Sequence, residues 1–440
     1  MKERIFKILA LLICLCLTFS SACTNKPSHG SSESKKESLP DSEYTTESEK
    51  ESLSSSESTT ESEKESLSSS ESTTESENES LLDSESTTES ENESETTSET
   101  EKESSSEETV FVDENGVVYQ TMGNSMKVVG YNGNGGDVTI AETYNGRPVT
   151  WIEGHAMGNL SSLTSIVIPD TVTWIGANAF RGCKNLTNVK IGSGLLSIGL
   201  RAFSCCEKLQ NIEVDENNLN FKSINGSLYS KGGTVLYQYA IGKKVTSLAI
   251  PEGINSIKEE AVKNASALTS VTIPDSVTYI GESAFSYCVN VRNINMSENV
   301  TFIGKSAFER CESLLSITLP DSITTISANA FKYCYNLTNV TIGDCIETIS
   351  FDAFYSCSKL EYAVIGHDVK RIFNSAFDST SGDFHVFYKG AASDWENVQI
   401  DADNAKLKLA KKYYYSKNKP TVGGNYWHYG IHSTIPSIWF

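Results

Sequence analysis

The eleven cysteines of this 440-residue sequence offer the widest choice of chemistry, because a thiol can bind metals, form disulfides or act as a nucleophile. Six of them follow a 23-residue spacing, in two runs: Cys183, Cys206, Cys288, Cys311, Cys334 and Cys357. A zinc site needs four ligands that converge on one point, whereas this spacing sets the thiols in a row. We therefore predict a buried column of small apolar side chains. The alternative is a few disulfides between neighbouring thiols, which an oxidising compartment would permit.

The six histidines do not form a recognisable catalytic or metal-binding motif. They are scattered along the chain, and none has the local context of a Cys–His or Ser–His–Asp arrangement: His29, His155, His367, His385, His428 and His432. No Gly-rich phosphate loop follows a strand-like segment. The sequence therefore predicts a protein that is not an enzyme, with no catalytic residues, no metal site and no cofactor.

Four aromatic residues are candidates for binding a ligand. They are large rings in a repeat position that Ser, Thr and Arg otherwise fill: Trp151, Trp174, Tyr279 and Phe302. Exposed aromatic side chains are common binding hot spots, and they can stack on sugars or peptides. The alternative is that these rings only cover the edge of the fold or its N-terminal cap.

The cysteines and aromatics are positioned by a 23-residue repeat that runs from Ile152 to about Tyr388. An Ile begins each of nine copies, with one longer interval of 59 residues: Ile152, Ile175, Ile198, Ile257, Ile280, Ile303, Ile326, Ile349 and Ile372. Ala stands four residues after every one of these Ile residues, and Phe follows the Ala in seven copies. A fixed period with apolar residues in phase predicts a solenoid of stacked coils, in which each coil buries its apolar side against the next.

Each copy contains one segment with the alternation of a half-buried strand. Leu163–Pro169 follows the pattern Leu-Thr-x-Ile-x-Ile-Pro, and Leu268–Pro274 follows it with Val271 in place of the first Ile. The side chains between the apolar ones should form a flat outer face rich in Ser, Thr and Asn. Its pairs are Ser165/Val167, Asn188/Lys190, Asn211/Glu213, Ser270/Thr272, Asn293/Asn295, Ser316/Thr318 and Asn339/Thr341. We expect an extended sheet surface without a deep cleft.

The repeat also resembles a known family. The pattern I-x-x-x-A-F-x-x-C-x-x-L-T-x-I-x-I-P-x-x-V-T-x-I, which is nearly complete from Ile280 to Ile303 and from Ile326 to Ile349, is similar to the BspA-like (Treponema-type) leucine-rich repeat of bacterial surface proteins. The resemblance covers a little over half of the chain. It implies a curved β-solenoid and a surface-exposed role in binding or adhesion, without naming a ligand.

Residues 1–22 are predicted to be a signal peptide. Lys2, Arg4 and Lys7 precede a short apolar run from Ile8 to Phe19, which is too short for an ordinary membrane span. Cys23 follows small residues, as in a bacterial lipoprotein cleavage site, so we expect Cys23 to carry a lipid anchor. The alternative is plain secretion, and both place the mature protein outside the cytoplasm.

Residues 23–108 are predicted to be a disordered stalk. From residue 31 this segment is almost entirely Ser, Glu, Thr, Lys and Asn, with too few apolar side chains to offset the entropy of ordering. Residues 31–108 hold 26 acidic and 5 basic residues, a net charge of −21, which equals that of the whole chain. The rest of the chain is therefore neutral overall, and the acidity says nothing about what the folded region binds.

The remaining segments flank or interrupt the repeat. Short strand-like runs at 109–151 predict a β cap over the first coil. Within the solenoid at 152–388, an insertion at about 215–245 resembles a hairpin, and we expect it to project from one side. The last 52 residues, 389–440, predict a C-terminal cap with a helix at Ala402–Lys411 and an aromatic tail that includes Tyr413–Tyr415 and Asn425–Tyr429.

We conclude from the sequence that the chain is mainly β and is a monomeric, extracytoplasmic protein, lipid-anchored at the outer face of a bacterial membrane. The preferred function is cell-surface recognition or adhesion, in which the solenoid face binds a protein or matrix partner. Two alternatives remain: binding of cell-wall or dietary polysaccharide through the exposed aromatics, and a structural role in a surface layer. Nucleic acid is not an expected partner.

Overall fold

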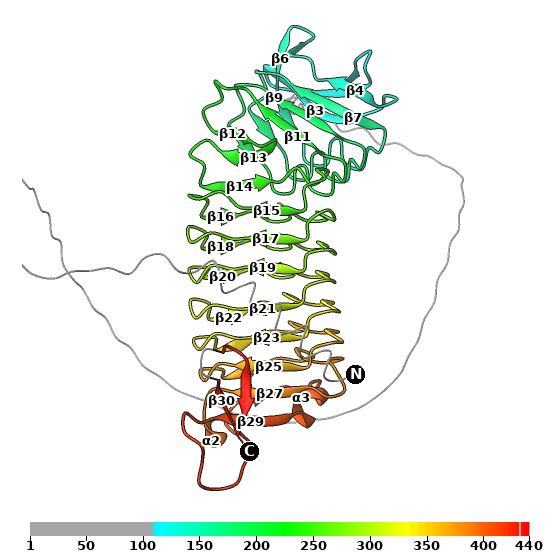
Figure 1. Ribbon diagram of the computed structural model, residues 1–440. Coiled ribbons are helices and arrows are strands. Elements are labelled where there is room, and N and C mark those ends of the chain that lie inside the picture. The colour runs from blue at the N-terminus through cyan, green and yellow to red at the C-terminus, as the bar shows by residue number, and fades with distance from the viewer. Residues whose placement is uncertain (1–108, 431–432, 440) are drawn as a thin grey trace, which may run out of the picture. The chain divides into compact units, whose positions relative to one another are not determined.

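The computed structural model describes residues 109–430 and 433–439 of the chain. The signal peptide, the lipidation of Cys23 and the stalk at 23–108 lie outside the described residues and stay predictions. The described part consists almost entirely of short strands, stacked in coils from one end to the other (Figure 1). It contains no helix long and apolar enough to cross a membrane.

The first strands form a small antiparallel sheet that merges with the solenoid. β1 (Val110–Val112), β2 (Val117–Met122) and β3 (Ser125–Tyr131) are antiparallel, and β3 pairs in parallel with β6 (Arg147–Ile152). β5 (Thr143–Tyr144) pairs with β6, and β4 (Gly136–Thr139) pairs with the first repeat strand, β7 (Leu163–Ile168). The apolar residues of β2 and β3 are buried in one core with Ile152 and Phe180. This segment therefore covers the open apolar side of the first coil.

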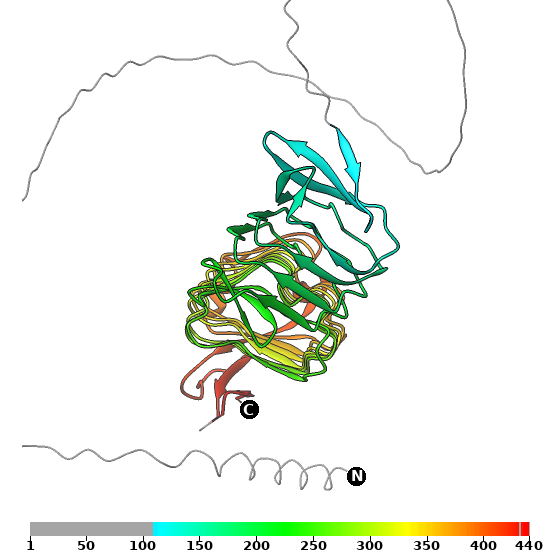
Figure 2. The same ribbon diagram turned by 90° about the horizontal axis from the view of Figure 1, so that it is seen from above.

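Each coil then contributes one strand to each of two parallel columns. The first column, whose outer side we call the strand face, contains β7, β9 (Asn188–Ile191), β11 (Asn211–Val214), β15 (Ser247–Ala249), β17 (Ser270–Thr272), β19 (Asn293–Asn295), β21 (Ser316–Thr318), β23 (Asn339–Thr341), β25 (Tyr362–Ile365), β27 (His385–Tyr388) and β29 (Lys411–Tyr415). The second column contains β6, β8 (Trp174–Ile175), β10 (Ser197–Ile198), β16 (Ser256–Ile257), β18 (Tyr279–Ile280), β20 (Phe302–Ile303), β22 (Thr325–Ile326), β24 (Thr348–Ile349), β26 (Arg371–Ile372) and β28 (Gln399–Ile400). Viewed along the stack, the coils drawn from yellow to orange superimpose closely, whereas the teal and dark-green coils at the N-terminal end are displaced from them (Figure 2).

In each column, neighbouring strands pair residues that are 23 positions apart, which is the period of the sequence. Ser165 pairs with Asn188, and Ile280 pairs with Ile303, one 23-residue step away in each case. The Ala-Phe pairs of the sequence are buried, and the rings of Phe285, Phe308 and Phe331 stack at centroid distances of 5.3 Å. The predicted fold class, a mainly β solenoid of 23-residue coils, is therefore confirmed.

The two ladders are interrupted at two junctions. The first is at the insertion, where β11 ends one sheet of the first column before β15 begins the next, and β10 ends one sheet of the second column before the sheet that holds β16. The second junction lies further along the stack. β19 ends one sheet of the first column and β21 begins the next, while β20 and β22 do the same in the second column. On the Ala-Phe side the same two coils remain hydrogen-bonded, since the Phe285 amide donates to the Ala307 carbonyl at 2.8 Å. We call this junction the seam.

The insertion does not project from the stack, and that expectation was wrong. β12 (Phe221–Ile224), β13 (Ser227–Ser230) and β14 (Val235–Gln238) form an antiparallel meander, and β14 pairs in parallel with β16. Leu236 thereby lies beside Ile257, in the place of a repeat Ile. Leu228 and Leu236 are fully buried, and their burial holds the meander in the stack as an irregular coil.

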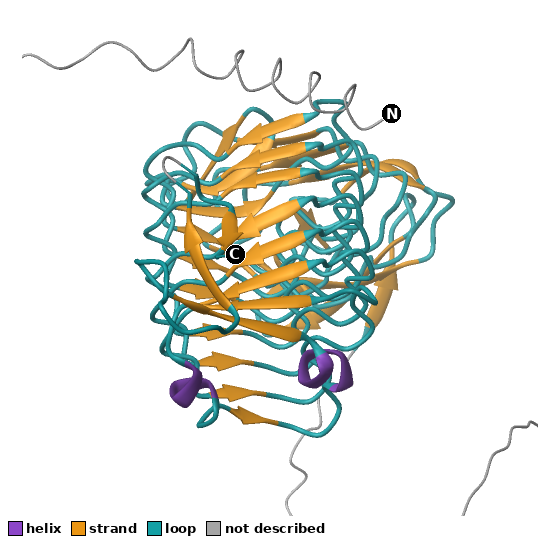
Figure 3. Ribbon diagram, turned by 60° about the horizontal axis from the view of Figure 1, so that its bottom comes forward, coloured by secondary structure: helices purple, strands orange, loops and turns teal. Residues whose placement is uncertain are grey.

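The C-terminal residues form two short helices and further strands. α2 (Ala392–Trp395) and α3 (Ala405–Leu409) lie at this end of the stack (Figure 3). The predicted helix at Ala402–Lys411 is too long, because Lys411 already belongs to β29, which pairs with β27. After β29, the chain forms β30 (Tyr426–Tyr429) and β31 (Pro436–Ile438), which are antiparallel to each other.

Candidate binding surface

The strand face presents a polar surface that repeats with the coils. The inward residues of its strands, such as Val189 and Val340, are buried, whereas the side chains between them are exposed or half-buried. At the first coil, Thr164 and Ser165 donate hydrogen bonds to Asp137, at 2.9 and 2.6 Å, and these bonds lower the pKa of that carboxyl. Lys190 and Glu213 are the charged members of the predicted outward pairs. The face as a whole can therefore offer hydroxyl and amide groups to a partner along its length.

The four predicted aromatic residues form two stacked pairs on the outer side of the second column. The rings of Trp151 and Trp174 lie 4.7 Å apart with an interplanar angle of 13°. Tyr279 and Phe302 lie 4.9 Å apart at 6°, and they are 37% and 44% exposed, whereas the two Trp residues are half-buried. Each pair joins neighbouring coils through the parallel register of its strands. The structure thus brings Trp151 to Trp174 and Tyr279 to Phe302, but the irregular coil of the insertion lies between the pairs.

The cysteine column is buried and its thiols are free. Each Sγ donates a weak hydrogen bond to a backbone carbonyl of the preceding coil, at 3.0 to 3.4 Å. Burial raises the pKa of the Cys183 thiol to about 11 and that of the Cys288 thiol to about 12. Such thiols are protonated at neutral pH and cannot act as nucleophiles or metal ligands. Within the described ranges, no group of three or more His, Cys, Asp or Glu residues could hold a metal ion.

The described histidines lie apart from one another. His155 takes a left-handed backbone conformation (φ 63°) and contacts the Asn178 amide. His367 lies 3.5 Å from the carboxylates of Asp344 and Asp368. The ring of His385 stacks on Tyr413 in the strand face. These contacts do not bring the histidines together into one site, and only Tyr413 among the named neighbours is buried.

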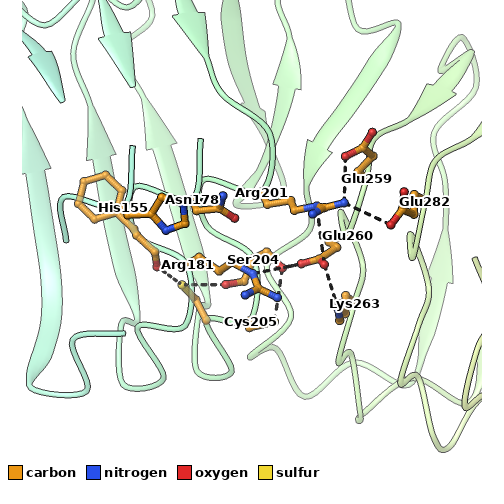
Figure 4. A network of polar contacts seen from close by, with 12 residues as sticks. His155, Asn178, Arg181, Arg201, Ser204, Cys205, Glu259, Glu260, Lys263 and Glu282 are labelled. Carbon is orange, nitrogen blue, oxygen red and sulfur yellow. Dashed lines mark hydrogen bonds and ion pairs between the residues drawn. The ribbon is translucent and has the colours of Figure 1, made fainter. Parts of the chain in front are cut away.

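A buried polar network beside the insertion was not predicted from the sequence. Glu260, whose side chain is only 5% exposed, accepts hydrogen bonds from Ser204 at 2.5 Å and from Lys263 at 2.9 Å (Figure 4). Arg181 and Arg201 lie 3.5 and 3.7 Å from the same carboxylate. Burial alone would raise the pKa of Glu260, but these hydrogen bonds and charges outweigh it and lower the pKa.

This network holds together the two regular coils on either side of the insertion. Ser204 and Glu260 are 56 residues apart in the sequence, on either side of the insertion, whose last strand β14 pairs with β16 just before Glu260. Arg201 also reaches Glu259 and Glu282, so its guanidinium joins the coil before the insertion to two coils after it. Glu260 lies three residues after the repeat Ile, a position that other coils fill with Ser, Asn, Asp, His or Arg, so the sequence contains little signal of this network.

The comparisons with known proteins agree with the repeat pattern. A family model described as "BspA type Leucine rich repeat region (6 copies)" matches residues 150–248, 235–361 and 279–388. A search of the curated proteins finds no match.

Among solved structures, the chain is similar to a leucine rich cell surface protein from Faecalibacterium prausnitzii, at 23% identity and a TM-score of 0.40, over 67% of this chain and 98% of that one. A leucine-rich repeat protein from Eubacterium ventriosum is 20% identical, with a TM-score of 0.46, over 61% of this chain and 94% of that one. The pneumococcal vaccine antigen PcpA is 17% identical, with a TM-score of 0.37, over 69% and 98%.

Proposed function

This chain belongs to the BspA-type leucine-rich repeat family, and from that premise we propose that it is a cell-surface recognition or adhesion protein whose solenoid face binds a protein or matrix partner. The observation that carries the proposal is the strand face itself. Its Ser, Thr and Asn side chains repeat in register over many coils. Recognition by such a face is the sum of many weak polar contacts made at once by a rigid surface, with little ordering needed on binding. We further propose that the chain acts outside the cytoplasm, as a monomer without enzymatic activity.

A second candidate function is the binding of polysaccharide. The stacked pairs Trp151–Trp174 and Tyr279–Phe302 favour it, because parallel rings that are half-buried or exposed on neighbouring coils offer an apolar strip to the face of a sugar. A structural surface-layer protein, the third candidate, would need neither the aromatic strip nor a soluble ligand.

A glycan and protein array probed with residues 109–440 distinguishes the three candidates. Binding of a protein or matrix component, unchanged in Trp174→Ala and Tyr279→Ala, supports the primary proposal. Binding of glycans that those variants lose supports the second candidate, and no binding to any spot leaves the structural role. Leu219→Ala is a matched control, since Leu219 is 81% exposed and lies in the insertion, away from both pairs.

The membrane anchor is proposed to be a lipid on Cys23, which would place the solenoid beyond the acidic segment at 23–108. Partition of the full-length chain into a detergent phase, compared with Cys23→Ser, tests this proposal. Loss of partition in the variant supports the anchor, whereas equal partition of both proteins contradicts it.

A further inference from the structure

The C-terminal hairpin lies across the strand face near its end. In Figure 1 the red C-terminal strands run in front of the orange strands of the last coils. Trp427 of β30 is fully buried, and its ring makes an edge contact with Phe387 at 5.7 Å. Its Nε1 donates a hydrogen bond to the Tyr388 carbonyl at 2.9 Å. With Val364 and Tyr413, these rings form a separate apolar cluster outside the main core, which fixes the hairpin on the face.

The fixed hairpin converts part of the open face into a groove of about 580 Å³. The floor is supplied by outward side chains of three successive coils, and the hairpin and the turn after β30 supply the wall. The lining residues are Ser316, Thr318, Asn339, Thr341, Tyr362, Tyr429, Ser433, Thr434 and Ile435. The sequence predicts a face without a deep cleft, so it did not anticipate this groove. The groove volume falls in the range of about 300–1,000 Å³ that is usual for small-ligand sites.

The lining is uncharged and rich in hydroxyl groups. Neither acidic nor basic side chains line the groove. Within the described part of the chain, the hydroxyls of Ser316, Thr318 and Thr341 make no hydrogen bond to protein, so they are free to donate to or accept from a ligand. Two tyrosine rings, one on the floor at Tyr362 and one on the wall at Tyr429, flank these hydroxyls.

We propose that this groove binds a neutral oligosaccharide. Sugars combine hydroxyl groups with apolar ring faces, which the free hydroxyls and the tyrosine rings match. The coils repeat at the parallel-strand spacing of about 4.8 Å, close to the rise of one sugar unit in an extended chain, so successive coils can contact successive units. The proposal deepens the surface-recognition function proposed above and rests on it.

A peptide fits the groove less well. Peptides that bind sheets usually add a strand at an exposed edge, through main-chain hydrogen bonds. The floor of the groove is instead the side-chain surface of β21, β23 and β25, whose backbones already pair with one another. No free edge is offered there.

An acidic glycan is also disfavoured. Tyr362 lines a second hollow, of about 320 Å³, together with Glu361 and Asp383. Two carboxylates next to the groove would repel uronic acids and sialic acids, so the charge around the site selects for uncharged sugars.

The test is isothermal titration calorimetry of the full-length chain with four neutral hexasaccharides (of β-glucan, xylan, mannan and chitin) and with hexagalacturonate as the acidic probe. The variants are Tyr429→Ala, Asn339→Ala, and the double variant Thr318→Val/Thr341→Val, which removes two hydroxyls and keeps the side-chain shape. Asn293→Ala is the matched control, because Asn293 occupies the same column outside the groove and is exposed. Circular dichroism checks that each variant is folded.

We expect saturable binding of at least one neutral hexasaccharide, weakened about tenfold or more in the groove variants and unchanged in Asn293→Ala. A tenfold loss corresponds to about 1.4 kcal/mol. Binding that the groove variants leave intact, stronger binding of hexagalacturonate, or no binding of any neutral probe overturns the proposal. If the array detects a partner whose binding the groove variants do not change, the general recognition function stands and only the proposed groove site is excluded.

Discussion

At the scale of single residues, the cysteine column shows how the fold suppresses a chemistry that the sequence offers. Six thiols lie in a row at intervals that could suit disulfides or thiolate reactions, but all six are fully buried and protonated. Two other described cysteines differ in exposure: Cys345 is exposed and Cys205 is half-buried. Reactivity should therefore follow exposure and not position in the repeat.

Alkylation should separate these cysteines. We expect iodoacetamide at pH 8 to modify Cys345 rapidly and the six column cysteines only after denaturation, because burial raises the pKa of thiols such as Cys183 and Cys288. Peptide mapping by mass spectrometry measures the modification at each site. Rapid native labelling of Cys288 or Cys311 would contradict a closed core.

The same thiols should make the fold sensitive to alkali. A pKa that is higher in the folded protein than the ordinary value of 9.0 gives stability that is present below pH 9 and is lost as the pH rises toward the folded pKa. We expect the melting temperature to be nearly constant from pH 7 to 8.5 and to fall steadily from pH 9 to 10.5. Thermal unfolding followed by circular dichroism measures this, and a melting temperature that rose over the second range would exclude the mechanism.

The phenylalanine column should carry much of the stability. Phe308 is fully buried between Phe285 and Phe331, so Phe308→Ala should cost about 3–5 kcal/mol in the free energy of unfolding. Phe302→Ala is the matched control, because Phe302 is close to Phe308 in the sequence but is 44% exposed. We expect this variant to lose about 1 kcal/mol or less in the free energy of unfolding. Urea unfolding measures both values, and equal losses would contradict the assigned core.

At the scale of residues, the sequence predicts well the burial of the side chains that recur with the 23-residue period. Ala, Phe, Cys and Leu recur in phase, so their burial in columns follows from one coil contacting the next. Glu260 and Tyr429 could not be predicted in the same way, since each acts through contacts outside the repeat. The two aromatic pairs lie between these cases: the stacking of Trp151 on Trp174 follows from the period, but their role as ligand-binding residues stays a prediction.

At the scale of elements, the turn between the two strand columns depends on two left-handed residues in each coil. They lie three and seven residues after the Ile, as Asp352 (φ 55°) and Ser356 (φ 58°) do in one coil. Asn, Asp and Ser occupy many of these positions, but Tyr333 and Arg310 also adopt the conformation. Left-handed backbone costs an ordinary residue roughly 1–2 kcal/mol, so the packing of neighbouring coils must hold it in place.

The Glu260 network should make the junction beside the insertion sensitive to acid. Because its pKa is lowered in the folded protein, its contribution is present above about pH 4.5 and is lost as the pH falls through the folded pKa. Glu260→Gln should cost on the order of 3 kcal/mol at pH 7, and the difference from the natural chain should shrink toward pH 3.

Urea unfolding at pH 7, 5 and 3 measures this difference. Glu207→Gln is the control, since Glu207 pairs with Lys184 at the surface, where both side chains are at least half exposed. A surface pair of this kind contributes little to stability. Equal losses in the free energy of unfolding for the two variants at pH 7 would contradict the role of the network in joining the coils.

Errors in the predicted elements occurred where the period stops. The meander was expected to project, because local alternation indicates a hairpin but not its partner; the pairing of Leu236 with Ile257 is set by the neighbouring coil. The helix at Ala402–Lys411 was predicted too long for the same reason. Its last residue, Lys411, pairs with His385 in the ladder, and this tertiary pairing overrides the local helical pattern.

At the scale of the whole molecule, the seam divides the strand ladders that follow the insertion into two stretches. Both ladders stop there, while the Ala-Phe side remains bonded across it. In a solenoid, stability is close to a sum of terms for coils and for the interfaces between neighbours. A weaker interface should therefore be the place where the stack opens first.

Hydrogen exchange should reveal this weakness. We expect backbone amides of β21 and β22 to exchange faster than those of β23 and β24, one coil further along, because only the latter have ladder partners on both sides. Exchange followed by mass spectrometry with residue-level fragmentation compares Ser316–Thr318 with Asn339–Thr341. Equal protection at both places would mean that the ladders are continuous in solution.

The 23-residue register also affects how such a gene can change over time. Because neighbouring coils pair at equivalent positions, as Ile326 does with Ile349, recombination between repeats that removes or adds one whole period rejoins like with like. The product keeps its caps and its core, and only the length of the stack changes, by about 4.8 Å for each coil. A lineage can thus lengthen or shorten this protein in uniform steps, while any exchange out of phase would be removed by misfolding.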